Sequence, residues 1–287
     1  MAFKMITGNF NSSVDRLDLH YRAYISKKYS PKKCIVIQHG FGEHSGRYQN
    51  VLDSFENTGY SLFIFDMRGH GLSKGIRGAG PAFDSFVKDL QSFIAYVQKK
   101  YKMEKPFLLG HSLGGLIALS YCLESKNERN IRALIVNGSL LAFQFTPVTR
   151  IKRAIGNLVT RFMPEIRANV GLNLKYISHD LETVQAYKND PLVHGKIKIS
   201  VADEIVKKGQ WCLEHASEMK IPVLMTHGAS DGISNPEGTI QFYENCGSID
   251  KTLIIYDNLY HEIYNEKNNQ QVFKDLIQWI DRRSRNK

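Results

Sequence analysis

A serine flanked by glycines lies near the middle of the chain, in the stretch GHSLG. Gly110, Ser112 and Gly114 occupy alternate positions there, between the apolar run PFLL and the longer apolar stretch LIALSYCLES. This pattern predicts a sharp strand-to-helix turn, in which glycines leave room for a strained backbone that presents the serine hydroxyl. The alternative is a glycine-rich turn that merely contains a serine. We interpret Ser112 as a candidate nucleophile.

A serine nucleophile needs a base, and the base needs a carboxylate that orients it. After such a turn the expected order along the chain is serine, acid, histidine. Asp231 lies in a loop rich in glycine and serine after one predicted strand, and His261 lies in the loop after the last one. Asp257 is a rival acid, but it ends the strand directly before the histidine. We therefore expect Ser112, Asp231 and His261 to form a catalytic triad.

Attack of a serine on a carbonyl carbon creates an oxyanion, which needs preorganised hydrogen-bond donors. The N–H of Leu113, the residue after the nucleophile, is expected to be one donor. The loop 39–42 follows an early predicted strand, and its glycines would let the N–H of Phe41 turn toward the serine. A mobile glycine loop is the alternative interpretation.

The stretch DMRGHGLSKG, residues 66–75, also groups polar side chains. Asp66, Arg68 and His70 could be taken for a site. An arginine in such a turn can clamp a carboxylate or loop carbonyls, and the glycines serve a tight turn. We interpret this stretch as structural, with Arg68 holding Asp66 or the loop backbone.

The elements that must position these residues follow an alternating pattern of strands and helices. Short apolar runs bounded by turn residues are typical of strands buried on both faces of a parallel sheet. Period-two alternation at 20–26 predicts an edge strand, and apolar residues at spacings of three and four predict helices at 82–100 and 270–282. This alternation predicts an α/β fold with a mostly parallel, doubly wound sheet. The buried strands are expected at 34–38, 61–65, 106–110, 132–137, 221–226 and 252–256.

The pattern breaks between 141 and 215, where no convincing strand is predicted. An insertion made mostly of helices at this place predicts a cap over the carboxyl ends of the strands, where ligands bind in open α/β sheets. The expected organisation is a core of residues 1–140 and 216–287 with a helical cap insertion at 141–215. Within it, the segment 148–166 is amphipathic. Its apolar face comprises Val148, Ile151, Ile155, Leu158, Val159 and Phe162, and its charges are Arg150, Lys152, Arg153, Arg161 and Glu165.

Length, charge and cysteine content narrow the class of protein. The 287 residues suffice for one large α/β domain, no apolar run approaches a transmembrane length, and the N-terminus has no apolar signal region. The net charge of +10 is spread along the chain without a nucleic-acid motif, so we expect no nucleic-acid binding, while weak attraction to anionic lipid stays open. The cysteines show no metal-like spacing, which favours reduced thiols in a cytoplasmic protein. They are Cys34, Cys122, Cys212 and Cys246.

Six motifs occur along the chain in the order HGFGEHSGRY, DMRGHGLSKG, GHSLGG, YKNDPLVHG, HGASDGISNPEG and YHEIYNE. In this order and spacing they resemble the motifs of the monoacylglycerol lipases of the α/β-hydrolase superfamily and of related bacterial lysophospholipase-like enzymes. The resemblance covers about residues 15–283, is weakest across 141–180, and implies the α/β-hydrolase fold with a cap that rests on membranes. For the segment 148–166 we expect that its apolar face mainly packs on the core, and adsorption to anionic lipid is the alternative.

The resemblance also implies residues that hold the glycerol end of the substrate. Glu43 and Arg47 fall in GEHSGRY, His111 falls in the serine turn, and Tyr187 falls in YKNDPL. The simpler interpretation is an ion pair between Glu43 and Arg47 and surface exposure of Tyr187. The small residue of the oxyanion loop is often alanine in this family. Here it is Phe41, which keeps the N–H but places a bulky ring at the pocket mouth.

The sequence thus predicts a serine ester hydrolase that acts on lipid esters, most of all monoacylglycerol or lysophospholipid, through an acyl-enzyme and without metal or cofactor. The expected partners are the lipid ester substrate and, as an open alternative, a membrane surface that the cap contacts. The sequence does not predict the oligomeric state. The alternatives are a generic short-chain carboxylesterase, a cofactor-free peroxidase, a binding module without catalysis, and an aminopeptidase-type enzyme. The last would need an acidic pair in the cap, and Glu182, Asp203 and Glu204 form no evident pair.

Overall fold

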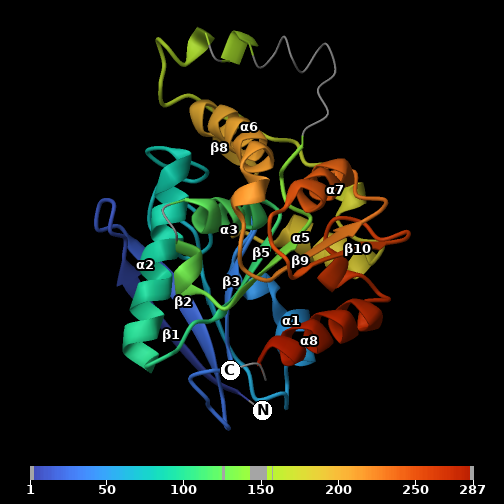
Figure 1. Cartoon of the computed structure of the whole chain (residues 1–287). Coiled ribbons are helices and arrows are strands. Elements are labelled where there is room, and N and C mark those ends of the chain that lie inside the picture. Colours follow the sequence, from blue (N-terminus) through green and yellow to red (C-terminus); the bar gives the residue numbers. More distant parts are fainter. Residues whose placement is uncertain (1–2, 125–126, 143–153, 157, 285–287) are drawn as a thin grey trace.

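One large sheet forms the centre of the molecule in the computed structural model, which describes residues 3–124, 127–142, 154–156 and 158–284 (Figure 1). Its strands are β1 (Phe3–Asn11), β2 (Asp18–Ser26), β3 (Cys34–Gln38), β4 (Ser61–Phe65), β5 (Phe107–His111), β6 (Ala133–Asn137), β9 (Val223–Gly228) and β10 (Lys251–Tyr256). They lie in the order β1-β2-β4-β3-β5-β6-β9-β10. β2 is antiparallel to both of its neighbours, and all strands from β4 to β10 run parallel. The predicted mostly parallel α/β sheet is confirmed.

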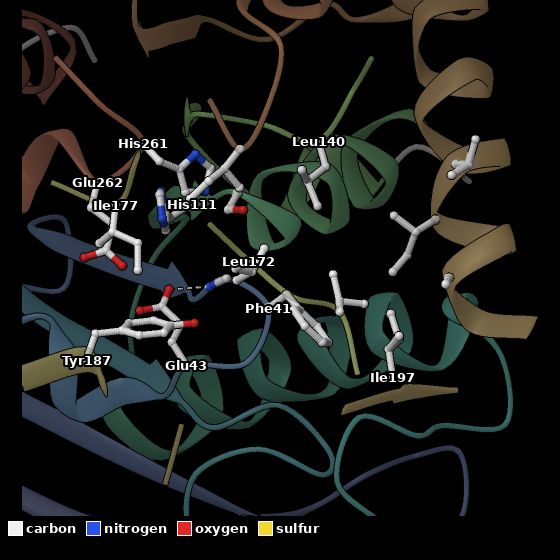
Figure 2. Close-up of a pocket in the computed structure, with 17 residues that line it drawn as sticks. Phe41, Glu43, His111, Leu140, Leu172, Ile177, Tyr187, Ile197, His261 and Glu262 are labelled. Atoms are coloured by element: carbon white, nitrogen blue, oxygen red, sulfur yellow. Dashed lines mark hydrogen bonds between the residues drawn. The ribbon is translucent and has the colours of Figure 1, made fainter. Parts of the chain in front are cut away.

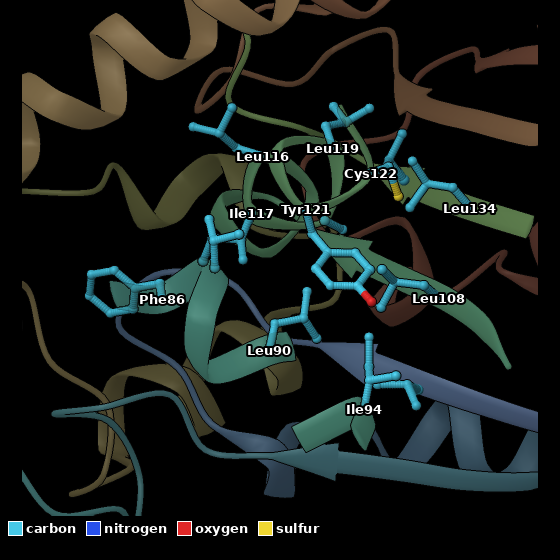
Figure 3. Close-up of a cluster of buried hydrophobic side chains, with 14 of the residues drawn as sticks. Phe86, Leu90, Ile94, Leu108, Leu116, Ile117, Leu119, Tyr121, Cys122 and Leu134 are labelled. Carbon is cyan, nitrogen blue, oxygen red and sulfur yellow. The ribbon is translucent and has the colours of Figure 1, made fainter. Parts of the chain in front are cut away.

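Helices cover both faces of this sheet, as its buried strands require. These helices are α1 (Gln49–Ser54), α2 (Phe83–Tyr101), α3 (Leu113–Leu123), α7 (Pro236–Asn245) and α8 (Gln270–Ser284), while α5 (Leu181–Asn189) and α6 (Ile199–Glu214) belong to the segment between β6 and β9. Side chains alternate between the two faces along each strand. Val36 and Leu108 therefore join the cluster under α2, α3 and α7, whereas Ile35 and Leu109 join the cluster under α1 and α8. Figure 3 shows α2 and α3 contributing Leu90, Ile94 and Ile117 to the first cluster.

The parallel strands bring four connecting loops to one edge of the sheet. The loop from Gly40 follows β3, Ser112 follows β5, and the loops that carry Asp231 and His261 follow β9 and β10. Because these strands are parallel, their carboxyl ends point in the same direction, and this is the edge where ligands bind in open α/β sheets. The sheet topology therefore gathers residues that lie more than 200 positions apart in the sequence.

Two predictions about the borders of the sheet were wrong. The segment 20–26 lies within β2, which is an inner strand, because β1 pairs along its whole length and forms the edge instead. The exposed positions of β1 alternate with partly buried ones and include polar residues, so its apolar signal was too weak to predict it. β10 is only partly buried because it is the opposite edge strand, whereas β3, β4, β5 and β6 are fully buried.

The insertion between β6 and β9 contains short strands as well as helices, contrary to the prediction that 141–215 holds no strand. β7 (Arg167–Asn169) and β8 (Lys196–Lys198) form an antiparallel pair that is separate from the main sheet. Each strand has only three residues, too few to show a period-two pattern. In Figure 1, α6 lies across the top of the sheet, at the end toward which the parallel strands run, and it packs against α3.

The amphipathic segment of the insertion does not pack on the core where it is described. Ile155, Leu158 and Phe162 are 56%, 57% and 82% exposed, so the prediction that the apolar face mainly packs on the core is wrong for these residues. Val148, Ile151 and the basic residues Arg150, Lys152 and Arg153 lie outside the described residues. In the part of the chain that the structure describes, no helix has the length and apolar character needed to cross a membrane.

Candidate active site

Ser112 lies at the turn between β5 and α3, with backbone angles φ 55° and ψ −120°. A positive φ is strained for a residue with a side chain, and the surrounding glycines make the turn possible. A Cβ on Gly110 would come within 2.5 Å of the Gly114 carbonyl, and a Cβ on Gly114 would collide with the carbonyls of Gln38 and His39. The alternating glycines thus allow α3 to approach β3 and β5 closely while Ser112 projects from the sheet edge.

Asp231 is hydrogen bonded to His261 across two neighbouring loops. The Nδ1 atom of His261 lies 2.6 Å from Oδ2 of Asp231, whose side chain is completely buried. The other carboxylate oxygen accepts the N–H groups of Ile233 at 2.8 Å and Ser234 at 3.0 Å. The rival acid Asp257 lies on the exposed surface. Asp231 is therefore the carboxylate that orients His261 in this structure.

The electrostatics of this pair suit an acid–base role. Burial alone would lower the pKa of His261, but the carboxylates of Asp231, Glu262 and Glu43 outweigh that effect and raise it. Burial opposes ionisation of Asp231, yet His261 and His227 hold its pKa well below the ordinary range. The carboxylate is thus ionised, and it stabilises the protonated imidazole that forms when a base takes a proton.

His261 and Ser112 line the same cavity, next to His111. The rings of His261 and His111 lie 4.8 Å apart between centroids. Burial is the main reason that the pKa of His111 is lowered to about 4, so this ring is neutral. Its Nδ1 atom lies 2.9 Å from Nδ2 of Asn137 and accepts from that amide, which leaves the proton of His111 on Nε2.

The backbone N–H groups of Phe41 and Leu113 are available for an oxyanion. Among the residues that the structure describes, neither N–H has a hydrogen-bond acceptor. Leu113 is the first residue of α3, where free N–H groups favour negative charge. The loop of Phe41 is fixed by the N–H of Gly40, which donates to Glu43 Oε1 at 2.6 Å. The ring of Phe41 lines the cavity and packs against His194.

Charged and hydroxyl groups form one end of the cavity. Arg47 donates two hydrogen bonds to Glu262, at 2.7 and 2.9 Å, and a third to Glu43 at 3.1 Å. Tyr48 donates to Glu43 at 2.9 Å, and the Tyr187 ring covers the Arg47 guanidinium at 4.5 Å. Glu43, Glu262 and Tyr187 line the main cavity, whereas Arg47 lies behind them.

At the charged end, burial has the largest effect on the pKa values of Glu262 and Tyr187, and it disfavours their ionised forms. The Arg47 guanidinium overcomes it and lowers the pKa of Glu262 to about 2. Burial likewise raises the pKa of Tyr187, so its hydroxyl is neutral. Of the residues expected to hold glycerol, the structure places Glu43, His111 and Tyr187 at the cavity wall and Arg47 in the layer behind it.

The other end of the cavity is aliphatic. Figure 2 shows Glu43, Tyr187 and Glu262 on one side, Leu140 and Ile197 on the other, and the two histidines nearer the charged side. The cavity holds about 300 Å³, enough for part of an acyl chain. Its remaining apolar lining comes mostly from the insertion and comprises Val170, Leu172, Ile177, Ala202, Ile205, Val206 and Ile233.

Three buried residues of this region were missed in the sequence analysis. Glu262 and His227 were not singled out, although their positions next to His261 and four residues before Asp231 were signals that could have been used. Ser234 was missed as well, and its hydroxyl donates to Asp231 Oδ2 at 2.8 Å.

The polar stretch 66–75 is structural, but Arg68 does not hold Asp66. Arg68 binds Asp89 at 2.6 Å and Asp15 at 3.0 Å, while Asp66 accepts the N–H groups of Ser45 and Leu72. The reason is that Asp89 extends from α2 toward Arg68, a contact that no local spacing could reveal. Within the described part of the chain, no group of three or more His, Cys, Asp or Glu side chains is arranged to hold a metal ion.

Comparisons with known proteins give a consistent result. The family described as serine aminopeptidase, S33 matches residues 29–268. A monoacylglycerol lipase of Mycolicibacterium smegmatis is 30% identical over 251 residues, which cover 87% of this chain and 88% of that protein. An uncharacterised abhydrolase domain-containing protein of Dictyostelium discoideum is 33% identical over 95% of this chain, but the chain spans only 28% of its length.

A solved structure with a similar fold is that of a soluble variant of monoglyceride lipase from Saccharomyces cerevisiae, in complex with a substrate analog. Its TM-score is 0.82 at 25% identity, with coverage of 100% of this chain and 97% of that one. The similarity therefore extends over the whole chain, including the insertion.

Proposed function

The chain belongs to the serine aminopeptidase, S33 family of the α/β-hydrolase superfamily, together with the monoacylglycerol lipases that it resembles, and on that premise we propose that it hydrolyses monoacylglycerols. The observation that carries the proposal is the two-ended cavity: one cavity, lined in part by Ser112, has polar groups at one end and aliphatic side chains at the other (Figure 2). An acyl chain fits the first end, and an uncharged polyol fits the second.

The proposed reaction is acyl transfer through Ser112. His261, oriented by Asp231, takes the hydroxyl proton while Ser112 Oγ attacks the ester carbonyl carbon. The Phe41 and Leu113 N–H groups stabilise the oxyanion, and the protonated His261 then gives its proton to the departing glycerol oxygen. Water attacks the acyl-enzyme with His261 again as base, which releases the fatty acid and restores Ser112.

The charges of the polar end favour glycerol over a phosphate-bearing head group. Two carboxylates, Glu43 and Glu262, face the cavity and share one guanidinium, that of Arg47, which lies behind them. A phosphate placed there would face negative charge without a cation among the described residues of the wall, and like-charge juxtaposition costs several kcal/mol. The carboxylate oxygens can instead accept hydrogen bonds from the hydroxyls of glycerol, and the Tyr187 hydroxyl can donate to them or accept from them. We therefore favour monoacylglycerol over lysophospholipid.

The test is a turnover panel on one preparation. The substrates are 1-oleoylglycerol, a lysophosphatidylcholine with the same acyl chain, a short aryl ester and an aminoacyl amide, with Ser112→Ala as the blank. We expect at least about tenfold higher kcat/KM for the monoacylglycerol than for the lysophospholipid. Preference for the lysophospholipid would overturn the head-group assignment. Preference for the aryl ester over both lipids, or for the amide, would replace the proposal with a generic carboxylesterase or an aminopeptidase.

We also propose that residues 141–215 act as a cap on a core of residues 1–140 and 216–287, and that the cap contacts lipid surfaces. Support for the first part is that Ala202, Ile205 and Val206 of α6 line the cavity that Ser112 faces. Support for the second is the exposure of Leu158 and Phe162 on the described part of the amphipathic segment, next to the basic Arg161. Apolar side chains that a soluble domain leaves unpacked, beside cationic ones, are typical of interfacial helices.

A further inference from the structure

Asp231 is in contact with a second histidine besides His261. His227, in β9, lies with its Nε2 atom 3.1 Å from Oδ2 of Asp231, the same oxygen that is bound by Nδ1 of His261. The side chain of His227 is completely buried, and it lines neither the cavity nor the surface. The proposed reaction does not use it, so its place beside the carboxylate needs another explanation.

The contacts of His227 define which of its nitrogens carries the proton. Its Nδ1 atom lies 2.7 Å from Oγ1 of Thr239, in α7. Asp231 is ionised and can only accept, so Nε2 of His227 must carry the proton that points to it. In the tautomer with its proton on Nε2, His227 has a bare Nδ1, which accepts the hydroxyl proton of Thr239. Thr239 thereby fixes the tautomer in which His227 donates to Asp231.

A serine completes this arrangement. The hydroxyl of Ser234 lies 2.8 Å from Oδ2 of Asp231, 2.9 Å from the Gly138 carbonyl and 3.1 Å from Nε2 of His227. One carboxylate oxygen therefore faces three polar groups at the same time, two of them imidazoles. The two donors other than His261, which are His227 and Ser234, hold the oxygen in place and take up part of the negative charge that would otherwise act on His261.

We propose that His227 is a positioning residue for the triad: its Nε2–H holds the Asp231 carboxylate in place against His261 and weakens the pull of that carboxylate on the catalytic imidazole. The proposal rests on the proposed triad of Ser112, Asp231 and His261. It adds that the basicity of His261 is set from behind Asp231, through a chain that begins at Thr239 in α7.

The other charged groups around His261 do not involve His227. Glu262 and Glu43 act on His261 from the polar end, and neutral His111 faces its ring. Within the described residues, the hydrogen bonds of Glu262 run to Arg47 and to the Asn265 side chain, away from β9. Removing the donor at position 227 therefore changes only the effect of Asp231 on His261. The effects of Glu262, Glu43 and His111 on His261 stay as they are.

The experiment measures how fast Ser112 reacts with a fluorophosphonate probe between pH 4 and 9. This rate reports the base-assisted nucleophile without reference to any natural substrate. His227→Phe removes the donor and keeps a ring of similar size. We expect the acid limb of the profile to shift to higher pH by about half to one pH unit. The reason is that Asp231 then attracts the protonated His261 more strongly and raises its pKa.

Thr239→Val provides a second variant if His227→Phe fails to fold. It removes the hydroxyl that fixes the tautomer but nearly keeps the volume, and a smaller shift in the same direction is expected. Ser120→Ala is the matched control, since it also removes a buried hydroxyl, which bonds to the Leu116 carbonyl inside α3. Its profile should not move.

The outcomes separate this proposal from the proposed function. Slower labelling in His227→Phe and Thr239→Val with an unmoved acid limb would reduce His227 to a packing residue. A shift in both variants together with no turnover of monoacylglycerol would support the role of His227 and overturn the substrate. A wild-type protein whose Ser112 does not react at all would overturn the triad and this inference with it.

Discussion

The two ends of the cavity are built by different principles. At the polar end, directional contacts hold the charged groups, with Arg47 joined to Glu262 at 2.7 Å and the Gly40 N–H donating to Glu43 at 2.6 Å. At the other end, aliphatic side chains such as Leu172, Ala202 and Val206 come from the insertion and make no directional contacts. The function of the polar end therefore depends on exact distances between groups, whereas that of the aliphatic end depends on the volume and shape that it leaves open.

On the proposed function, this difference assigns separate tasks to the two ends of the cavity. Groups that must act on a reacting atom are anchored at the carboxyl edge of a rigid sheet, where an error of about 1 Å can cost on the order of 100-fold in rate. Groups that accommodate an acyl chain need only the right shape and tolerate substitution within it. We therefore expect changes at the polar end to abolish function or folding, and changes at the aliphatic end to alter selectivity.

The largest effect is expected at Asp231, the carboxylate of the proposed triad. Asp231→Asn keeps the shape but cannot hold His261 in the tautomer that accepts a proton, so kcat should fall by about 10⁴-fold. The measurement is steady-state hydrolysis of a soluble ester, with circular dichroism to show that the variant is folded. Asp257→Asn is the matched control and should leave kcat unchanged. A similar loss in both variants would contradict the assignment of Asp231.

The next effect is a loss of stability at the polar end. Arg47→Met leaves Glu43 and Glu262 buried without their cation, which should lower the free energy of unfolding by about 3–5 kcal/mol in urea titrations at pH 7. Lys267→Met removes an exposed partner that lies 3.9 Å from Asp180, and there we expect less than about 1 kcal/mol.

The pH dependence of that deficit has a defined sign. Pairing lowers the pKa of Glu262 to about 2 from 4.5, so its contribution to stability is fully present above pH 4.5 and is lost as the pH falls toward 2. The difference between wild type and Arg47→Met should therefore narrow below pH 4.5. A deficit that stays constant down to pH 3 would mean that Arg47 stabilises the fold by packing alone.

The same contrast explains what could be predicted from the sequence. The strands and the serine turn carry strong local signals, since β3 to β6 are continuous apolar runs and Ser112 lies between glycines. Asp231 and His261 followed from chain order once the parallel sheet was predicted, because parallel strands end at one edge.

Contacts between distant segments were not accessible in this way. Glu262 is adjacent to His261, yet its role depends on Arg47, which lies 215 positions away. The ion pair between Arg68 and Asp89, which lie 21 positions apart, and the pairing of β7 with β8 also join segments that no local pattern connects. The aliphatic end was predicted only as a region, because no spacing rule states which residues of an irregular insertion line a cavity.

A moderate effect is expected from filling the aliphatic end. Ala202→Phe reduces the space for the acyl chain, so the ratio of kcat/KM for a long over a short monoacylglycerol should fall by about 10- to 200-fold. The rate on the shortest ester should change little, because the triad is untouched. Gln210→Phe places the same ring on the exposed side of α6 and should leave the ratio unchanged. An equal loss on all chain lengths would show that this end is as geometry-dependent as the polar end.

The smallest effect concerns the outer surface of the insertion, where the chemistry is farthest away. Leu158→Ser with Phe162→Ser should weaken binding to anionic phosphatidylglycerol vesicles by about five- to tenfold in sedimentation, since partial insertion transfers only part of each side chain from water. Ile249→Ser is the control, because Ile249 is fully exposed but precedes β10, outside the insertion. Turnover of a soluble ester should be equal in all three proteins. Vesicle binding that depends as much on Ile249 would mean that general surface hydrophobicity, rather than the insertion, brings the protein to lipid.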